Sequence, residues 1–168
     1  FRRVLALDPE GRAEVLLSGQ PFDHLAVGDR FIAATAGTTL YLAETADPAV
    51  KGSLEIGTGV EAMALAVSGD TVFVSGSDRT VYAIEPGPLP VQSHLLRREP
   101  LFSVGGNPIE LLDTSGDSLF YAVGDVLHRF DLGLGFDQPD QLTTLPEGFK
   151  LHNRVKRIVE DRKNSLLA

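Results

Sequence analysis

The chain has 168 residues, of which 43% are hydrophobic, which is enough for one globular domain with its own core. It contains no cysteine, which excludes disulfides, thiolate metal sites and a cysteine nucleophile, and no apolar run approaches the roughly 18 residues that a membrane helix needs. The formal net charge is −8, and the acidic groups gather in residues 1–149, so phosphate attraction does not favour a nucleic-acid partner.

Two predicted strands open the chain. Residues 1–8 form an apolar run that ends on Asp8, and residues 13–18 form a second run after a turn at 9–12. Runs of aliphatic residues separated by Pro and Gly are typical of strands joined by a tight turn.

Three longer units follow, each with four predicted strands. Short runs of β-branched and aromatic residues alternate with turns that contain Gly, Asp or Ser. Residues 86–100 hold four prolines and are predicted to be a long outer loop of the second unit. The predicted strands are 24–27, 31–35, 39–42 and 52–56, then 63–67, 71–75, 80–84 and 101–104, then 109–113, 119–123, 126–130 and 141–145.

The final segment, 149–168, allows two interpretations. Strands at 155–159 and 165–168 with a turn between them would continue the pattern of the earlier units. The apolar residues also fall on one face of a helix. The phase of the pattern favours strands.

Two markers recur along the chain at intervals of about forty residues, which is typical of propeller repeats. An acidic residue closes the third strand of each unit, and a Gly-Asp turn joins the first two strands. We therefore predict an all-β fold, a β-propeller of four-stranded antiparallel blades. The acidic residues are Asp8, Glu44, Glu85 and Asp131, and the turns are at 28–29, 69–70 and 116–117.

The pattern divides the chain into three whole blades and two half blades. Two closures follow from this division. The terminal halves could form one composite blade and close a four-bladed ring, or the chain could be part of a larger ring whose remaining blades lie on the same or another chain. The predicted boundaries are 1–20 (half blade), 21–58, 59–107 and 108–148 (whole blades) and 149–168 (half blade).

Residues 40–57, LYLAETADPAVKGSLEIG, resemble the LVIVP-type propeller repeat. Residues 66–85, AVSGDTVFVSGSDRTVYAIE, resemble the same repeat and YVTN- and quinoprotein-like propellers, and residues 155–168 resemble blades of two-component-regulator sensor propellers. The resemblance implies a bacterial propeller, exported, periplasmic or at the cell surface, that serves binding or assembly. The chain departs from quinoprotein enzymes because it has no tryptophan to stack on a quinone.

No catalytic or metal-binding constellation stands out. The four histidines, at 24, 94, 128 and 152, lack the spacing of metal ligands and are predicted to be structural. The turn residues Asp29, Asp70 and Asp117 lack the spacing of a calcium loop and are predicted to form Asx turns. No phosphate loop and no G-x-S-x-G motif occurs. We therefore expect no cofactor and no metal, and an enzyme such as a lactonase or quinoprotein is the least favoured class.

Propeller geometry brings two sets of loops to one mouth of the central channel. These are the links between blades and the turns between the second and third strands. Their polar members, Asp78, Arg79, Asn107 and Asp125, are predicted to bind a ligand. In the long loop, Leu95, Leu96, Arg97 and Arg98 are predicted to contact a protein partner. The favoured function is a non-enzymatic scaffold within a larger assembly, and the alternative is a sensor or a propeller that binds a sugar or another small ligand.

Overall fold

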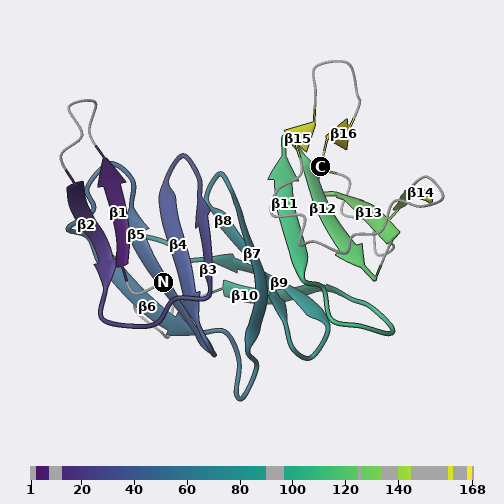
Figure 1. The fold of residues 1–168 in the computed structure, drawn as a ribbon, viewed down its shortest axis with the longest axis horizontal. Helices are drawn as coiled ribbons and strands as arrows, with labels where there is room; N and C mark the ends of the chain where they lie inside the picture. The colour runs from purple at the N-terminus through teal and green to yellow at the C-terminus, as the bar shows by residue number, and fades with distance from the viewer. Residues whose placement is uncertain are drawn as a thin grey trace.

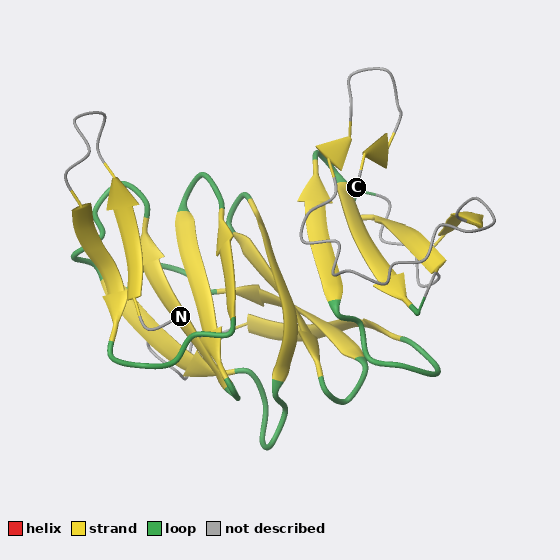
Figure 2. Ribbon diagram, in the orientation of Figure 1, coloured by secondary structure: helices red, strands yellow, loops and turns green. Residues whose placement is uncertain are grey.

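The computed structural model describes residues 3–7, 13–89, 97–124, 126–133, 140–144, 159–160 and 166–167. The regular secondary structure of these ranges consists of β-strands, as the sequence predicts (Figure 2). A helix long and apolar enough to cross a membrane is not found in them.

Three antiparallel sheets of four strands follow one another along the chain, and we name them blades A, B and C. In each blade the strands are paired in chain order, so each sheet is a simple meander. Blade A contains β3 (His24–Val27), β4 (Phe31–Ala36), β5 (Thr39–Glu44) and β6 (Lys51–Glu55); blade B contains β7 (Ala62–Ser68), β8 (Thr71–Gly76), β9 (Thr80–Glu85) and β10 (Arg97–Ser103); blade C contains β11 (Leu111–Ser115), β12 (Ser118–Val123), β13 (Val126–Asp131) and β14 (Asp140–Thr144).

The blades pack face to face, with their first strands gathered together. β7 contacts both β3 and β11, so the inner edges of the three sheets are neighbours. The blade A and blade B faces share a hydrophobic core in which Phe31 and Leu40 of blade A meet Val72 and Ile84 of blade B. A similar core joins blades B and C. Radial packing of four-stranded sheets is the defining feature of a propeller, and it confirms the predicted fold class.

Gly28, in the β3–β4 turn, allows a close approach between blades A and B. A Cβ atom at this position would lie 2.5 Å from Cγ1 of Val67 in β7. The absence of a side chain at residue 28 therefore permits the turn to rest on the neighbouring sheet.

The two ends of the chain form separate two-stranded sheets. β1 (Arg3–Leu7) pairs with β2 (Ala13–Ser18), and β15 (Val159–Glu160) pairs with β16 (Leu166–Leu167). Figure 1 shows these two pairs at opposite ends of the row of blades. The strand interpretation of the final segment therefore holds for its described residues. Among the described residues these two pairs belong to separate sheets, and the choice between a composite blade and a larger ring stays a prediction.

One predicted boundary was wrong. The long outer loop was predicted to extend from residue 86 to residue 100, but Arg97–Pro100 belong to strand β10. The strand accommodates Pro100 because β10 is the outermost strand of its sheet, where a missing N–H is tolerated, and the pairing with β9 shifts register between Pro100 and Phe102.

Candidate functional site

The links between blades and the turns between second and third strands meet on one side of the molecule, which we call the link face. The carbonyl of Gly37, in the β4–β5 turn of blade A, accepts from the backbone N–H of Ala62, the first residue of β7 in blade B, at 2.9 Å. In blade B, the N–H of Val104 donates to the carbonyl of Arg79 in the β8–β9 turn at 3.0 Å. These bonds tie each turn to the link that leaves its own blade.

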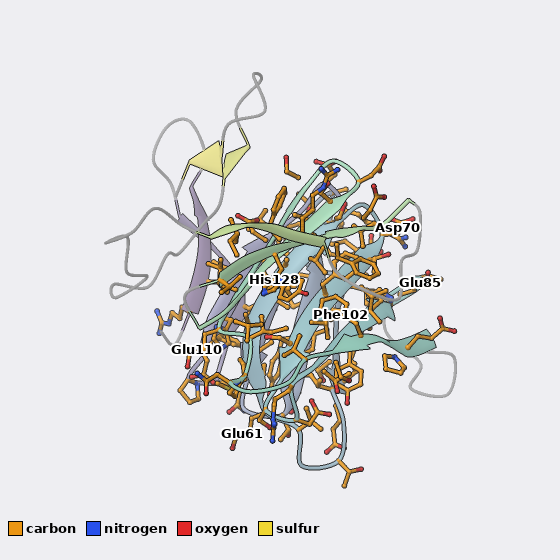
Figure 3. The ribbon with its side chains drawn as sticks, turned by 90° about the vertical axis from the view of Figure 1, so that its right-hand side faces the viewer. Glu61, Asp70, Glu85, Phe102, Glu110 and His128 are labelled. Atoms are coloured by element: carbon orange, nitrogen blue, oxygen red, sulfur yellow. The ribbon has the colours of Figure 1, made fainter. Side chains whose placement is uncertain are left out.

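Figure 3 shows that the link face lies at one end of the strands. Glu61, in the link before β7, lies at the lower end of the view, and Asp70, in the β7–β8 turn, lies near the opposite end. The link before β7 and the β7–β8 turn are therefore at opposite ends of the strands.

The β8–β9 turn, residues 77–79, is the best-defined part of the link face. The N–H of Arg79 donates to the carbonyl of Gly76 at 2.9 Å, and Arg79 itself has φ of 68°. This is the three-residue hairpin loop in which a turn is followed by a left-handed residue, a position that normally favours Gly. A non-glycine residue pays a steric cost there of roughly 1–2 kcal/mol. The turn therefore displays an exposed arginine from a strained backbone.

Asp78 is fixed by bonds within the same hairpin. Its Oδ1 accepts from the N–H of Thr80 at 3.1 Å, and its Oδ2 accepts from the hydroxyl of Tyr82 at 2.5 Å. A Cβ atom at Gly76 would lie 2.5 Å from Asp78 Oδ1, so glycine at residue 76 leaves room for the carboxylate. Asp78 serves to fix the turn, while Arg79 points its charge to solvent. The contribution of Tyr82 is not evident from the sequence, because the contact depends on the length of the loop.

Asn107 lies on the link that follows blade B. Its side chain is exposed, three residues after Val104, whose N–H bonds to Arg79. The structure thus brings the link of Asn107 and the turn of Asp78 and Arg79 to the same face. Asp125, the fourth predicted residue of the channel mouth, lies outside the described residues.

The predicted partner-binding residues divide between two settings. Leu95 and Leu96 lie outside the described residues. Arg97 and Arg98 belong to β10 rather than to a loop, paired with Glu85 and Ile84 of β9. These two arginines are therefore held in register on the outer strand of blade B.

Arg30 connects blades A and B on the side opposite the link face, a role that the sequence does not indicate. Its guanidinium lies 3.0 Å from the carboxylate of Asp70, donates to the carbonyl of Gly87 at 3.2 Å, and lies 4.6 Å from the centroid of the Phe31 ring. Asp70, predicted as an Asx-turn residue, thus forms an ion pair between blades. Asp78 and Asp131 do accept the short-range backbone bonds of Asx turns.

The two described histidines have structural contacts. His24 Nε2 lies 3.3 Å from the carbonyl oxygen of Ala62 in the next blade. The ring of His128 stacks on Tyr121, with centroids 4.9 Å apart, and burial lowers the pKa of His128 below its usual range. Burial also raises the pKa of the Tyr121 hydroxyl. Within the described ranges, no group of three or more histidine, aspartate or glutamate residues is placed to hold a metal ion.

A shallow hollow of about 310 Å³ lies away from the link face, between β2 and the outer strands of blade A. It is lined by Leu17, Ser18, Tyr41, Lys51, Gly52 and Ser53. None of the predicted site residues contributes to it.

Comparison with known proteins identifies a fold and no family. No protein-family model and no curated protein matches the chain. Solved structures that match include PorZ, a bacterial surface component of the type-IX secretion system of Porphyromonas gingivalis (TM-score 0.57, 12% identity, covering 83% of this chain). The WD40 β-propeller domain of Doa1 also matches, with a TM-score of 0.51 and 11% identity over 82% of this chain. The computationally designed Ika8 protein matches with a TM-score of 0.51 and 18% identity over 77% of this chain.

This chain spans 19%, 45% and 39% of the lengths of those three structures. Likeness at such low identity concerns the fold alone. Together with the radial packing of blades A, B and C, it identifies the fold of the chain as consecutive β-propeller blades.

Proposed function

We propose that the chain is a non-enzymatic scaffold that binds a protein partner through its link face, within a larger assembly. The observation that carries this proposal is Arg79, an exposed arginine held at φ of 68° in a turn whose neighbouring carboxylate is already bonded. Strain in the backbone that packing does not explain is a reason to suspect function. Arginine on a rigid support is also a common anchor at protein interfaces.

The same reasoning extends to the other predicted residues of this face. Asn107 and Asp125 are proposed to add polar groups to the same binding surface, and Asp78 positions the turn. Leu95, Leu96, Arg97 and Arg98 are proposed as a second contact on the outer side of blade B. The LVIVP- or YVTN-type character of the blades and an exported location stay predictions from the sequence resemblance.

The substitution Arg79→Gly separates a structural role from a binding role. Glycine fits the left-handed position, so we expect the free energy of unfolding to stay the same or rise by about 1 kcal/mol. Binding should weaken because the guanidinium is lost. The measurement is affinity capture of partners from native extract by the immobilised chain, with captured proteins quantified, alongside urea unfolding.

Lys51→Ala is the matched control, because it removes a cation from β6 in the outer part of blade A. We expect Lys51→Ala to capture the same partner as wild type and Arg79→Gly to lose about tenfold or more of it. Equal recovery with Arg79→Gly would rule out the link face as the binding surface. Deletion of residues 90–96 tests the second contact in the same assay.

The alternative, binding of a sugar or another small ligand at the channel mouth, predicts a different result. A ligand that binds the folded chain raises its melting temperature. A thermal-shift screen should then reveal a compound that raises the melting temperature of wild type but not that of Arg79→Ala. If the screen finds no such compound, the scaffold is the better proposal.

A further inference from the structure

Blade C is held against blade B by two kinds of contact. At the inner edge, β11 lies against β7 and β8, and two hydroxyl groups form hydrogen bonds between the blades. Ser75 Oγ donates to the carbonyl of Ile109 at 2.8 Å, and Thr114 Oγ1 donates to the carbonyl of Val67 at 2.8 Å. Hydroxyl and carbonyl groups carry no charge between acidic and neutral pH, so these two bonds do not respond to pH in that range.

The outer part of the same interface consists of aromatic rings. Phe102 of β10 lies on the rings of Tyr121 and Phe130, with centroids 4.8 and 5.0 Å away. His128 is the cross-strand neighbour of Tyr121, and its ring stacks on Tyr121 with centroids 4.9 Å apart and an angle of 12° between the planes. The contact of β12 and β13 with the outermost strand of blade B therefore depends on stacked rings, one of which can take up a charge.

One nitrogen of the His128 ring is enclosed without a hydrogen-bond partner. Nδ1 of His128 and the hydroxyl of Tyr121 are both buried, and neither forms a hydrogen bond within the protein. A neutral imidazole with its proton on Nε2 tolerates this setting, because Nδ1 then holds only a lone pair. An imidazolium has a proton on both nitrogens, so it would bury a charged N–H with no acceptor. The closed interface therefore favours the neutral ring, and burial lowers the pKa of His128 accordingly.

The charged residues of the described ranges do not form an ion pair with His128. Its cross-strand neighbours are Tyr121 on β12 and Gln141 on β14, and neither is a charged residue at neutral pH. The nearest charged residues occupy register positions of the other face of blade C or the outer end of β9 and β10: Asp113, Arg129, Asp131 and Asp140, and Glu85, Arg97 and Glu99. Figure 3 shows Glu85 well away from His128, on the far side of Phe102.

We propose that the contact between blades B and C is an acid-sensitive hinge. When His128 takes up a proton, the stacked rings separate and β12 and β13 move away from β10, while the bonds of Ser75 and Thr114 keep β11 on blade B. Opening exposes Nδ1 to water, which removes the cost of the buried charge. This hinge goes beyond the proposed function and does not depend on it, because Arg79 belongs to a turn of blade B that takes no part in the ring stack.

The lowered pKa of His128 determines the direction of the response. A histidine whose pKa is lower in the folded chain than in the unfolded chain contributes stability that is fully present above the unfolded pKa, about 6.5. That contribution is lost progressively as the pH falls below this value. We therefore expect the interface to be closed at neutral pH and to open in the acidic range.

The first test is hydrogen exchange of the full chain from about pH 8 to about pH 5, followed for each blade and corrected for the intrinsic exchange rate. We expect the protection of β12 and β13 to fall severalfold on acidification, while that of β4 and β5 in blade A stays the same. His128→Phe keeps an aromatic ring beside Tyr121 but cannot take up a proton, so it should abolish the fall.

His24→Gln is the matched control for this experiment. It removes a titrating ring from the contact between blades A and B and keeps a side-chain donor for the carbonyl of Ala62. We expect His24→Gln to show the same fall of protection in blade C as wild type.

The second test titrates His128 directly in the wild-type chain, so it does not depend on a variant that folds poorly. The ring resonances of His128, followed by nuclear magnetic resonance, should give a midpoint below about 6.5.

Three results would overturn the proposal. These are a midpoint at or above the ordinary value, a protection of β12 and β13 that does not fall or falls equally in His128→Phe, and an equal fall in blades A, B and C. The last result would mean that acid destabilises the whole chain rather than one contact. A chain without this acid response that still captures its partner through Arg79 would leave the proposed function intact.

Discussion

The two faces of blade A differ in how completely they are covered. The face toward blade B meets a whole sheet, and its core contains Phe31, Leu40 and Ile56, all of which are fully buried. Among the described residues, the opposite face packs against β1, β2 and Phe22, which cover the middle of the sheet and leave Leu25 and Val27 in solvent. The difference teaches that the burial of a propeller residue depends on the neighbouring blade as much as on its own strand.

The strongest way to sharpen this comparison is to truncate equivalent leucines. Leu65→Ala removes a side chain packed between blades A and B, and we expect the free energy of unfolding to fall by about 2–5 kcal/mol. Leu25→Ala, at the same position on the uncovered face, should cost about 1 kcal/mol or less in the monomer. Urea unfolding at low protein concentration checks both. Similar losses for the two variants would mean that Leu25 is covered in solution.

A second comparison concerns two equivalent buried hydroxyls. Ser75 Oγ donates to the carbonyl of Ile109, in the link before β11, at 2.8 Å, and both residues are fully buried. Thr35 holds the same position in blade A, but its hydroxyl is buried with no hydrogen-bond partner, while His24 contacts the carbonyl of Ala62.

We therefore expect opposite effects from removing these hydroxyls. Ser75→Ala leaves a buried carbonyl unsatisfied and should destabilise the chain by about 1–3 kcal/mol. Thr35→Val keeps the shape and removes an unpaired polar group, so stability should stay the same or rise. Thermal unfolding of the two single variants gives the comparison, and a large loss for Thr35→Val would indicate a bonded hydroxyl in solution.

The smallest expected effect is at the polar contact between blades A and B. Arg30→Met keeps an unbranched aliphatic side chain beside Phe31 but removes the guanidinium and its ion pair with Asp70. The side chains of Arg30 and Asp70 are both more than a third exposed. Such a pair contributes about 1 kcal/mol or less and is screened by salt. Chemical unfolding should show a small loss at low salt that disappears at high salt. A loss independent of salt would assign the contact to the Gly87 carbonyl or the ring instead.

The local structure could be predicted from the sequence because its signals are local. Gly-Asp turns and alternating β-branched residues are sufficient to place strands such as β4, β8 and β13. The exception is Arg97–Pro100, where four nearby prolines indicated a loop. Only the pairing of β10 with β9 at the sheet edge shows that a strand is tolerated there.

Contacts between blades could not be predicted in the same way. The turn of Asp78 and Arg79 was expected on the channel mouth, and the structure places it on the link face. However, the bond from Tyr82 to Asp78 within one hairpin depends on the length of the β8–β9 loop, and the bridge made by Arg30 depends on the separation of two sheets. The exposure of Leu25 depends on strands that are not its neighbours in the chain.

The missing side chain at Gly28 also has a geometric consequence. The distance from one sheet to the next at that edge determines how sharply successive sheets turn about the common axis. A methyl group there would push Val67 away and separate the inner edges of blades A and B, so the angle between the two sheets would decrease. A circle assembled from narrower wedges would need more members, so a single hydrogen atom at residue 28 helps to determine the circumference that such sheets can complete.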